Sequence, residues 1–560
     1  MAGGGTAHCA ALARLAAAVS RVKRSAPCYV PSAVTSTLTD PRTRSAYSEG
    51  AGIYRIIPAA VALPAGVEDV VALVRDAERG SSPLIPRGAG SGMPGGNVGR
   101  GVILDMSRAF TTLEVDARRR VARAGASVTW AKVTQAAALH GLRLPPDPSS
   151  GAFATCGGMV ATNAAGPRSV RYGSVRPWVE ALDLVTQGGE VRTIRRGGGA
   201  GPWHLTPDTR HLVAGHFPRT RKNSSGYALD AFAASGDEVD LFIGAEGTLG
   251  IVTAVEWRLD PIPHASAGVA LSLASLDALG EAATYLVTLD PSAVELLDRT
   301  LLDFVAAAGG AVPTGAECLL LVEFERDSAA AARGVVGDAV RGLKHLTLQA
   351  DTALDRSGLE RLWGIRRLAS PALARLPETR RSLQVVEDGC VPLNRLAEYV
   401  RGLRAAAARH DVPVAIFGHA GDGHVHVNAL PDLTQPRWRE ALQALYDDVL
   451  ALLQRLGGTP SGEHGDGRLR AGALESFFGP ALIGRFRELK TASDPRSIFN
   501  PGVILPAADW APLADLKVGD GAATIPDDIA ARLRDLERSG GWATPKQDLA
   551  WKSSAPPASP

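Results

Sequence analysis

The chain has 560 residues, more than one hydrophobic core usually covers, and 45% of them are hydrophobic, which predicts at least two folded domains. Sixty basic and fifty-eight acidic residues leave a formal charge of +2, too small to indicate a nucleic-acid or anionic-membrane partner. No apolar stretch approaches the ~18 residues of a membrane span. We therefore expect small molecules or other proteins as partners, no nucleic acid and no transmembrane segment.

The cysteines and the N-terminus indicate the compartment. The five cysteines are scattered, and no two have the C-x-x-C spacing, which argues against a disulfide framework or an iron–sulfur module and favours a reducing environment. Residues 1–45 predict a helical segment rather than a secretory signal, because the basic residues follow the apolar run instead of preceding it. A cytoplasmic location is expected. Peripheral attachment at an inner membrane and an organelle transit peptide are the alternatives, the latter because no acidic residue precedes Asp40.

Residues 46–262 predict a first domain of mixed helices and strands. Residues 67–79 have apolar side chains at helical spacing. Strand-like runs follow at 84–86, 102–106, 179–185, 191–194, 241–243 and 250–257. The runs 179–185 and 191–194, separated by residues 187–190, form a predicted hairpin. Two prolines, Pro261 and Pro263, then interrupt the pattern, and we place the domain boundary there.

Residues 263–505 predict a second domain. Strand-like runs such as 318–324 alternate with alanine-rich helices, which indicates a sheet covered on one face by helices. Residues 506–560 are rich in Pro, Gly, Asp and Lys and contain one helical pattern, at 526–538. They predict an extended C-terminal tail.

A glycine-rich loop follows the strand at 84–86. It contains one G-x-G-x-x-G match, at Gly90, Gly92 and Gly95. A Rossmann site would need this motif to open a helix, whereas here the loop leads into the strand at 102–106, so binding of NAD is disfavoured. The loop instead offers unobstructed backbone N–H groups that could cradle a diphosphate. A plain surface loop is the alternative.

Four segments resemble the FAD-binding domain of the p-cresol methylhydroxylase (PCMH) and vanillyl-alcohol oxidase superfamily. They are residues 86–92, 144–150, 155–166 and 244–252. The resemblance implies a PCMH-type domain of two subdomains that binds FAD. It implies contacts with the pyrophosphate from Pro86, Arg87, Gly88, Ala89, Gly90 and Ser91, and contacts along the flavin from Pro146, Asp147, Ser149, Gly157, Gly158, Thr162 and Asn163. It also implies contacts towards the adenine from Glu246, Gly247 and Ile251.

Covalently flavinylated members of that superfamily carry a His in or near the first loop. This sequence has no His between His8 and His140, so non-covalent FAD is expected. Residues 221–227 also resemble a segment that lies close to the flavin in the family. An ordinary solvated turn explains them equally well.

A histidine-rich hairpin is predicted in the second domain. Strand-like runs 414–417 and 424–430 flank the tight turn 418–423. Period-two alternation places three polar side chains on one face of the returning strand: His424, His426 and Asn428.

The same hairpin brings His419, at the turn entrance, towards His426. A carboxylate from the Gly-Glu-His-Gly turn at 462–465 would complete a metal site with two nitrogen ligands and one oxygen ligand that leaves positions open for substrate. A lone His is usually structural, but these residues form a cluster.

Both segments resemble the C-terminal FAD-linked oxidase domain of the group that includes D-lactate dehydrogenase, glycolate oxidase and D-2-hydroxyglutarate dehydrogenase. The likeness includes residues 362–366, 387–392 and 494–502 and extends over about 47–505. It implies an α+β fold with an antiparallel sheet and helices. It also implies a divalent metal, Zn or Mn, on His419, His426 and Glu463, with His464 as catalytic base, Arg366 and Asn428 at the substrate and Asn500 near the flavin.

Three departures limit this transfer. Asp466 stands where relatives have an apolar residue, and it could tune the base or face solvent. His424 replaces a common Asn and is expected to support the ligands rather than join them. No lysine precedes Asp388 in 385–388; relatives that act on hydroxyglutarate use that lysine for a distal carboxylate, so a monocarboxylate such as D-lactate or glycolate is expected.

The resemblance thus implies an FAD-dependent dehydrogenase that oxidises a small D-2-hydroxy acid to the 2-oxo acid. Hydride would pass to flavin N5, and electrons would leave to a separate acceptor: a quinone, a cytochrome or an iron–sulfur protein. The alternatives are a flavin oxidase, an alkyl-transferring relative on the same fold, and a non-catalytic flavoprotein component of an electron-transfer complex. Homo-oligomerisation is left open.

Overall fold

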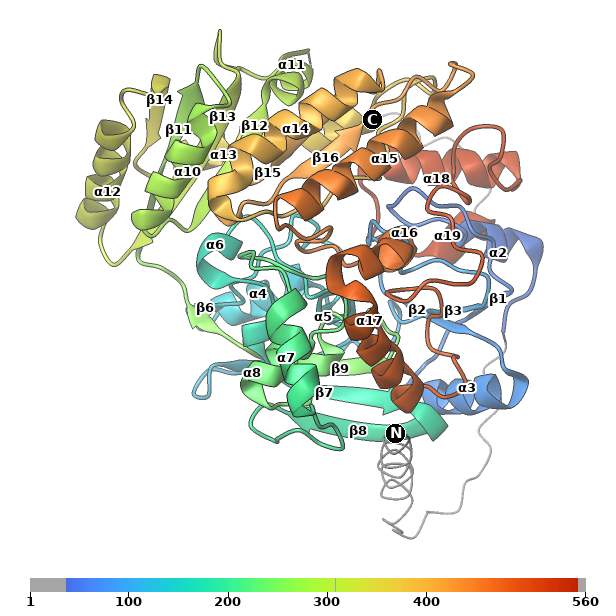
Figure 1. Cartoon of the computed structure of the whole chain (residues 1–560). Helices are drawn as coiled ribbons and strands as arrows, with labels where there is room; N and C mark the ends of the chain where they lie inside the picture. Colours follow the sequence, from blue (N-terminus) through green and yellow to red (C-terminus); the bar gives the residue numbers. More distant parts are fainter. Residues whose placement is uncertain (1–36, 308, 552–560) are drawn as a thin grey trace, which may run out of the picture.

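A computed structural model describes residues 37–307 and 309–551 (Figure 1). Three main sheets organise it: a three-stranded and a five-stranded sheet in the N-terminal half, residues 37–262, and a six-stranded sheet in the C-terminal half, residues 263–505. The predicted N-terminal helical segment lies outside the described residues up to residue 36. The fold class is α+β, as predicted.

The first sheet is parallel and carries the glycine-rich loop. Its strands lie in the order β1 (Ala60–Ala62), β3 (Val102–Asp105), β2 (Leu84–Arg87). Helix α3 (Val67–Gly80), which was predicted at 67–79, joins β1 to β2. Loop 88–101 then returns to the start of β3 without a helix, which excludes a Rossmann arrangement at this loop.

The second sheet is antiparallel and has the order β4 (Leu113–Asp116), β5 (Val121–Gly125), β9 (Ile251–Arg258), β7 (Val179–Thr186), β8 (Glu190–Arg195). The pairing of β7 with β8 confirms the predicted hairpin. Helix α5 (Cys156–Thr162) packs on this sheet. The predicted strand at 241–243 is wrong, because Leu241 and Phe242 belong to helix α9 (Val239–Phe242) and Ile243 caps its end. So short a buried apolar run does not distinguish a strand from a helical turn.

The third sheet is antiparallel and has the order β14 (Thr347–Ala353), β11 (Ala265–Leu273), β13 (Cys318–Arg326), β12 (Ala293–Asp298), β15 (Val414–His419), β16 (His426–Ala429). One face is covered by α10 (Ala278–Thr288), α12 (Ala329–Gly342), α14 (Leu396–Arg409) and α15 (Trp438–Arg455). Contrary to the prediction, helices α11 (Arg299–Ala307) and α13 (Arg356–Ala374) pack on the other face. The reason is visible in β13, where consecutive residues are buried and apolar side chains point to both faces.

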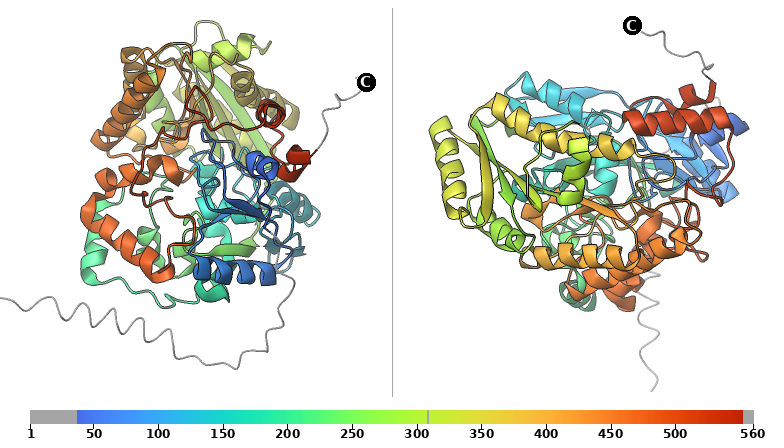
Figure 2. Two further views of the ribbon diagram at one scale, coloured as in Figure 1. Left: turned by 90° about the vertical axis from the view of Figure 1, so that its right-hand side faces the viewer. Right: turned by 90° about the horizontal axis from the view of Figure 1, so that it is seen from above.

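The C-terminal segment, residues 506–551, is not the extended tail that its composition suggested. It forms α18 (Asp527–Ser539) and α19 (Lys546–Trp551), and only the first of these was predicted. Figure 2 shows both helices, in red, beside the blue α2 (Pro41–Ala46). Ile529 and Leu533 are buried in one cluster with Val61 and Ile103 of the first sheet, so this segment is part of the N-terminal half's core.

The remaining elements connect these layers. They are α4 (Trp130–Ala138), β6 (Leu142–Arg143), α6 (Ser169–Tyr172), α7 (Pro207–His216), α8 (Leu229–Ser235), β10 (Asp260–Pro261), α16 (Gly467–Arg470), α17 (Leu474–Ser493) and the 3-10 turns η1 (Arg176–Trp178), η2 (Gln187–Gly189), η3 (Leu393–Arg395), η4 (Ala420–Asp422) and η5 (Ala471–Ala473). None of the helices in the described part of the chain combines the length and the hydropathy that crossing a bilayer requires.

Candidate functional site

One cavity of about 710 Å³ joins the two halves. Most of the residues expected to bind FAD line it: Pro86, Arg87, Gly88, Ala89, Gly90, Ser91, Ser149, Gly157, Gly158, Thr162, Glu246, Gly247 and Ile251. The same cavity reaches the residues expected at the substrate and the metal: Arg366, His426, Asn428, Glu463 and His464. The fold therefore brings the two sets, far apart in the sequence, to one space.

The glycine-rich loop forms a cradle at one end of this cavity. Gly90 has a positive φ of 79°, which favours glycine, and a Cβ added at Gly88 would lie 2.3 Å from Thr155 Oγ1. The loop residues present fit an FAD diphosphate, because Gly88, Gly90 and Gly92 line the cavity and add no side chain to this part of its wall. The guanidinium of Arg87 plays another part: it is buried and donates to the carbonyls of Tyr47 and Glu49, at 3.0 and 2.6 Å.

Four of the expected FAD contacts are not among the residues that line the cavity. Pro146 is buried beside it, and Asp147 forms an ion pair with Arg168. Asn163 ends α5 with a left-handed φ of 52°. Asn500, the fourth, donates from its amide to the carbonyls of Gly96 and Glu246, at 2.8 and 2.9 Å. Asp147 and Asn500 thus hold neighbouring loops in place.

Glu246 joins the N-terminal half to the Glu-His turn. Its Oε1 accepts from the backbone N–H groups of Asp466 and Gly467, at 2.7 and 3.1 Å. Burial, together with the charge of Asp466, raises the pKa of Glu246 to about 8. Burial also raises the pKa of Asp466 to about 6. Asp466 is fully buried, so it does not face solvent.

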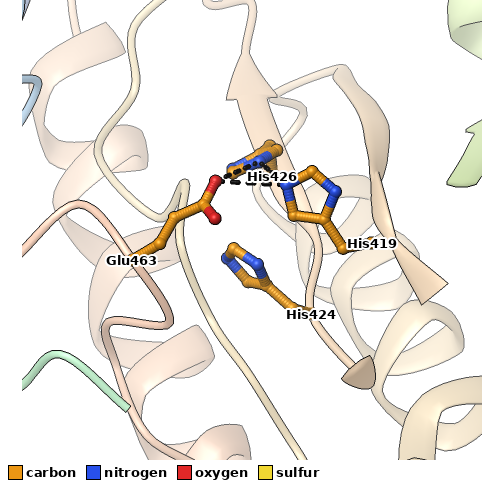
Figure 3. A group of neighbouring side chains, drawn as sticks. All are labelled: His419, His424, His426 and Glu463. Atoms are coloured by element: carbon orange, nitrogen blue, oxygen red, sulfur yellow. Dashed lines mark hydrogen bonds and ion pairs between the residues drawn. The ribbon is translucent and has the colours of Figure 1, made fainter. Parts of the chain in front are cut away.

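Three expected metal ligands converge at the other end of the cavity (Figure 3). Glu463 Oε1 lies 3.1 Å from His419 Nε2 and 3.3 Å from His426 Nε2, and the two imidazole nitrogens are 3.3 Å apart. His419 ends β15 and His426 begins β16, which are the paired strands of the predicted hairpin. This set of two nitrogens and one oxygen fits a divalent cation such as Zn²⁺ or Mn²⁺.

Glu295 of β12 orients His419. Its carboxylate is hydrogen-bonded to His419 Nδ1, so that Nε2 faces the other two ligands. Although burial disfavours the imidazolium, the Glu295 carboxylate raises the pKa of His419 to about 9. Nothing in the apolar run 293–298 singled out Glu295 in the sequence. Only the pairing of β12 with β15 places it opposite His419.

His424 has both ring nitrogens engaged by protein groups. Nε2 lies 2.8 Å from Asp388 Oδ1, and Nδ1 lies 3.1 Å from the Lys222 ammonium. Burial and the Lys222 charge lower the pKa of His424 well below its usual range. A neutral ring can accept from Lys222 and donate to Asp388, an arrangement that suits a supporting part better than that of a ligand. Lys222 lies in the segment 221–227, and its role could not be read there.

His464, the expected catalytic base, is held in place by neighbouring side chains. Its Nδ1 donates to Glu387 Oε2 at 2.6 Å, and its ring stacks on His426 at 4.9 Å between centroids. Glu387 Oε1 in turn accepts from Arg470 at 2.6 Å. Burial opposes protonation, but Asp388 and Glu387 raise the pKa of His464 to about 10. The arrangement leaves Nε2 as the nitrogen available to a molecule in the cavity.

Two further side chains complete the substrate end. Arg366 of α13 is buried over the Phe417 ring, 4.4 Å from its centroid, and its Nε donates to Glu295 at 3.1 Å. Asn428 accepts from Ser382 and Gln384, at 2.9 and 3.2 Å. Glu295 therefore connects the expected carboxylate-binding arginine to a metal ligand.

Asp388 organises the backbone of the Glu-His turn. Its Oδ2 accepts from the N–H groups of Glu463 and His464, at 3.1 and 2.8 Å, and from the Ser461 hydroxyl at 2.6 Å. These bonds send neighbouring side chains in different directions, Glu463 to the histidine pair and His464 to Glu387.

Comparison with known proteins agrees with this geometry. A family model described as FAD linked oxidases, C-terminal domain, matches residues 262–504, and one described as FAD binding domain matches residues 58–195. The chain is 32% identical to D-lactate dehydrogenase of Archaeoglobus fulgidus over 80% of this chain and 91% of that protein. It is 30% identical to glycolate oxidase subunit GlcD of Bacillus subtilis over 80% of this chain and 89% of that protein.

Two other similarities are more partial. D-2-hydroxyglutarate dehydrogenase of Pantoea ananatis is 29% identical over 84% of this chain but only 50% of that protein. A solved alkyldihydroxyacetonephosphate synthase superposes with a TM-score of 0.55 at 18% identity, covering 80% of this chain and 77% of that one. The second similarity shows a shared fold.

Proposed function

This chain belongs to the FAD-linked oxidases, and on that premise we propose that it is an FAD-dependent dehydrogenase that oxidises a small D-2-hydroxy acid to the 2-oxo acid. The observation that carries the proposal is the single cavity in which the FAD-binding loops, Arg366, His426, Glu463 and His464 all meet. FAD, when bound, supplies the acceptor for the hydride that leaves C2.

The metal would be held by His419, His426 and Glu463. A divalent cation at these three side chains would lower the pKa of a hydroxyl group bound to it, as it does for water. Glu295 and Lys222 fix the orientation of two of these ligands through His419 Nδ1 and Glu463 Oε2. The third, His426, stacks on His464 and so lies beside the proton-accepting group.

The protein side chains divide the remaining work. Arg366 binds the substrate carboxylate, an ion pair that suits a planar guanidinium. In its neutral form, which a divalent cation beside the ring would favour over the imidazolium, His464 Nε2 takes the proton of the 2-hydroxyl group, a general-base role worth typically ~10²–10⁴-fold in rate. Asn428 contacts the substrate beside them. The cofactor is bound by the expected residues that line the cavity: Pro86, Arg87, Gly88, Ala89, Gly90, Ser91, Ser149, Gly157, Gly158, Thr162, Glu246, Gly247 and Ile251.

The substrate is proposed to be a monocarboxylate, D-lactate or glycolate. The position before Asp388 is occupied by Glu387, which binds His464 and Arg470, so no lysine is present there for a second carboxylate. We propose that electrons leave to a separate acceptor, a quinone, a cytochrome or an iron–sulfur protein. FAD is proposed to be non-covalent, because His426 and His464, at the metal end, are the only histidines among the described residues that line the cavity.

Anaerobic mixing with D- and L-2-hydroxy acids tests this function. The purified flavoprotein should lose its flavin absorbance with D-lactate or glycolate and keep it with L-lactate. Admission of air afterwards distinguishes a dehydrogenase, which reoxidises slowly, from an oxidase. Absence of reduction by every D-2-hydroxy acid would refute the proposal.

A further inference from the structure

The C-terminal segment forms part of the cavity wall although both family matches end before it, the later one at residue 504. The last turn of α18 and the residues after it line the cavity: Arg534, Glu537, Arg538, Ser539, Gly540 and Trp542. No sequence motif assigned a role to these residues.

Helix α18 is anchored on one side to the N-terminal half. Ile529, Leu533 and Leu536 are buried in the cluster that contains Val61 and Ile103. Burial of such side chains stabilises the attachment, so substitutions of charged residues on the other side of α18 leave its anchor intact.

On its other side α18 forms ion pairs with residues 376–381 of the C-terminal half. Glu378 accepts from Arg534 at 2.8 Å and from Arg538 at 2.6 Å, and Glu537 accepts from Arg381 at 2.6 Å. α18 therefore bridges the two halves at the edge of the cavity. Just after this bridge, Ser382 contacts Asn428 on the substrate side.

This edge has an excess of positive charge. Four arginines belong to it, Arg375, Arg381, Arg534 and Arg538, all of which line the cavity. Among the described residues, the carboxylates paired with these arginines are Glu378 and Glu537, and Glu537 also accepts from Lys517. The Arg538 side chain is 41% exposed and that of Glu378 57% exposed, so their charges act on ions in solution.

We propose that α18 forms an anion-selective entrance to the cavity, in which Arg538 and its neighbouring arginines raise the local concentration of the substrate anion and Glu378 limits this effect. A cleft edge of one charge sign accelerates entry of the opposite ion, and the effect weakens with ionic strength. The identity of that anion, a 2-hydroxy acid, rests on the proposed function.

The entrance is tested with flavin fluorescence quenching by iodide and by neutral acrylamide at about 10 mM ionic strength, where the Debye length is about 30 Å. Arg538→Glu should lower the iodide quenching constant about three-fold or more, and Glu378→Gln should raise it. Acrylamide quenching should be unchanged in both. A structural effect would change the quenching constants of both variants in the same direction, with iodide and with acrylamide. The expected opposite changes in the iodide quenching constant therefore separate a charge effect from a structural one.

Arg341→Glu is the matched control, because Arg341 on α12 is 73% exposed, pairs with Asp338 and does not line the cavity. With D-lactate, Arg538→Glu should also lower the second-order rate constant of flavin reduction while the limiting rate stays unchanged. Equal iodide quenching in Arg538→Glu and Arg341→Glu would overturn the entrance. If iodide responds as expected but no D-2-hydroxy acid reduces the flavin, the entrance stands and the proposed function fails.

Discussion

Lys222 donates to Glu463 Oε2 across 2.5 Å, although the two residues are 241 positions apart in the sequence. Both side chains are buried. Burial opposes the charge of Glu463, but Lys222 and His419 hold the pKa of its carboxyl well below its usual range. Glu463 is therefore an anion with one oxygen on Lys222 and the other facing the histidine pair.

Replacing Lys222 by Met should destabilise the metal-free protein by about 3–5 kcal/mol, because it removes the cation bonded to Oε2 of a buried carboxylate and leaves that oxygen unpaired. Zn²⁺ or Mn²⁺ should then raise the melting temperature of the variant more than that of the wild type, since the metal ion takes over the neutralisation of Glu463. Thermal unfolding with and without metal measures both effects. Lys132→Met, an exposed lysine of α4, is the control. An equal metal-induced rise in wild type and variant would contradict the expected exchange of cations.

The metal ligands and the base should respond differently to truncation. His464→Ala should retain metal and FAD but lose at least ~10²-fold in the rate of flavin reduction, the lower range for a general base. His419→Ala, His426→Ala and Glu463→Ala should instead lose the metal. Metal analysis beside anaerobic stopped-flow reduction separates the two classes. Full metal occupancy in the ligand variants, or near-normal flavin reduction in His464→Ala, would contradict the separate roles of the metal ligands and the base.

Arg366→Ala should weaken substrate binding while the metal stays bound, because the carboxylate loses its guanidinium partner. The dependence of the reduction rate on D-lactate concentration should show a raised apparent dissociation constant. Arg367→Ala, at an exposed neighbouring position of α13, is the control. An unchanged dissociation constant would place the carboxylate elsewhere.

Glu387→Gln should slow flavin reduction by about 10–100-fold, a typical loss when a carboxylate that orients a histidine is removed. The glutamine keeps the size of the side chain but offers His464 and Arg470 a neutral partner. FAD content and substrate dissociation constant should stay unchanged. If the loss appeared in substrate binding alone, Glu387 would not be positioning the base.

The raised pKa values of Glu246 and Asp466 predict a stability that falls as pH rises. A carboxyl group whose pKa is higher in the folded than in the unfolded state contributes its full stability only below the unfolded pKa, near 4. This contribution is lost as pH rises through the folded pKa, which is about 6 for Asp466 and about 8 for Glu246. Glu246→Gln removes one of the two charges, so its melting temperature should decline less than that of wild type between pH 5 and pH 8. Glu281→Gln, exposed on α10, serves for comparison, and parallel curves for wild type and Glu246→Gln would refute the linkage.

The parts of the site that sequence reasoning could predict are those built from local geometry. Alternation along 424–430 and the turn before it suffice to bring His419 and His426 together, and hairpin β15–β16 confirms this. Lys222 and Glu295 could not be predicted in this way, because each reaches its ligand only through packing of distant segments. The prediction of an extended tail for residues 506–551 was also wrong, because it was based on composition. The apolar side of α18 consists of only a few residues among many charged ones.

The packing of α18 and α19 against α2 has a consequence for how the polypeptide is made. The apolar surface of Val61, Ile85 and Ile103 is covered by residues that come much later in the sequence, Ile525 to Ala550. On a ribosome the first sheet therefore emerges long before the segment that completes its core. The N-terminal half must wait, with that surface exposed, until that later segment has been synthesised, and during this interval it is open to capture by chaperones or to aggregation.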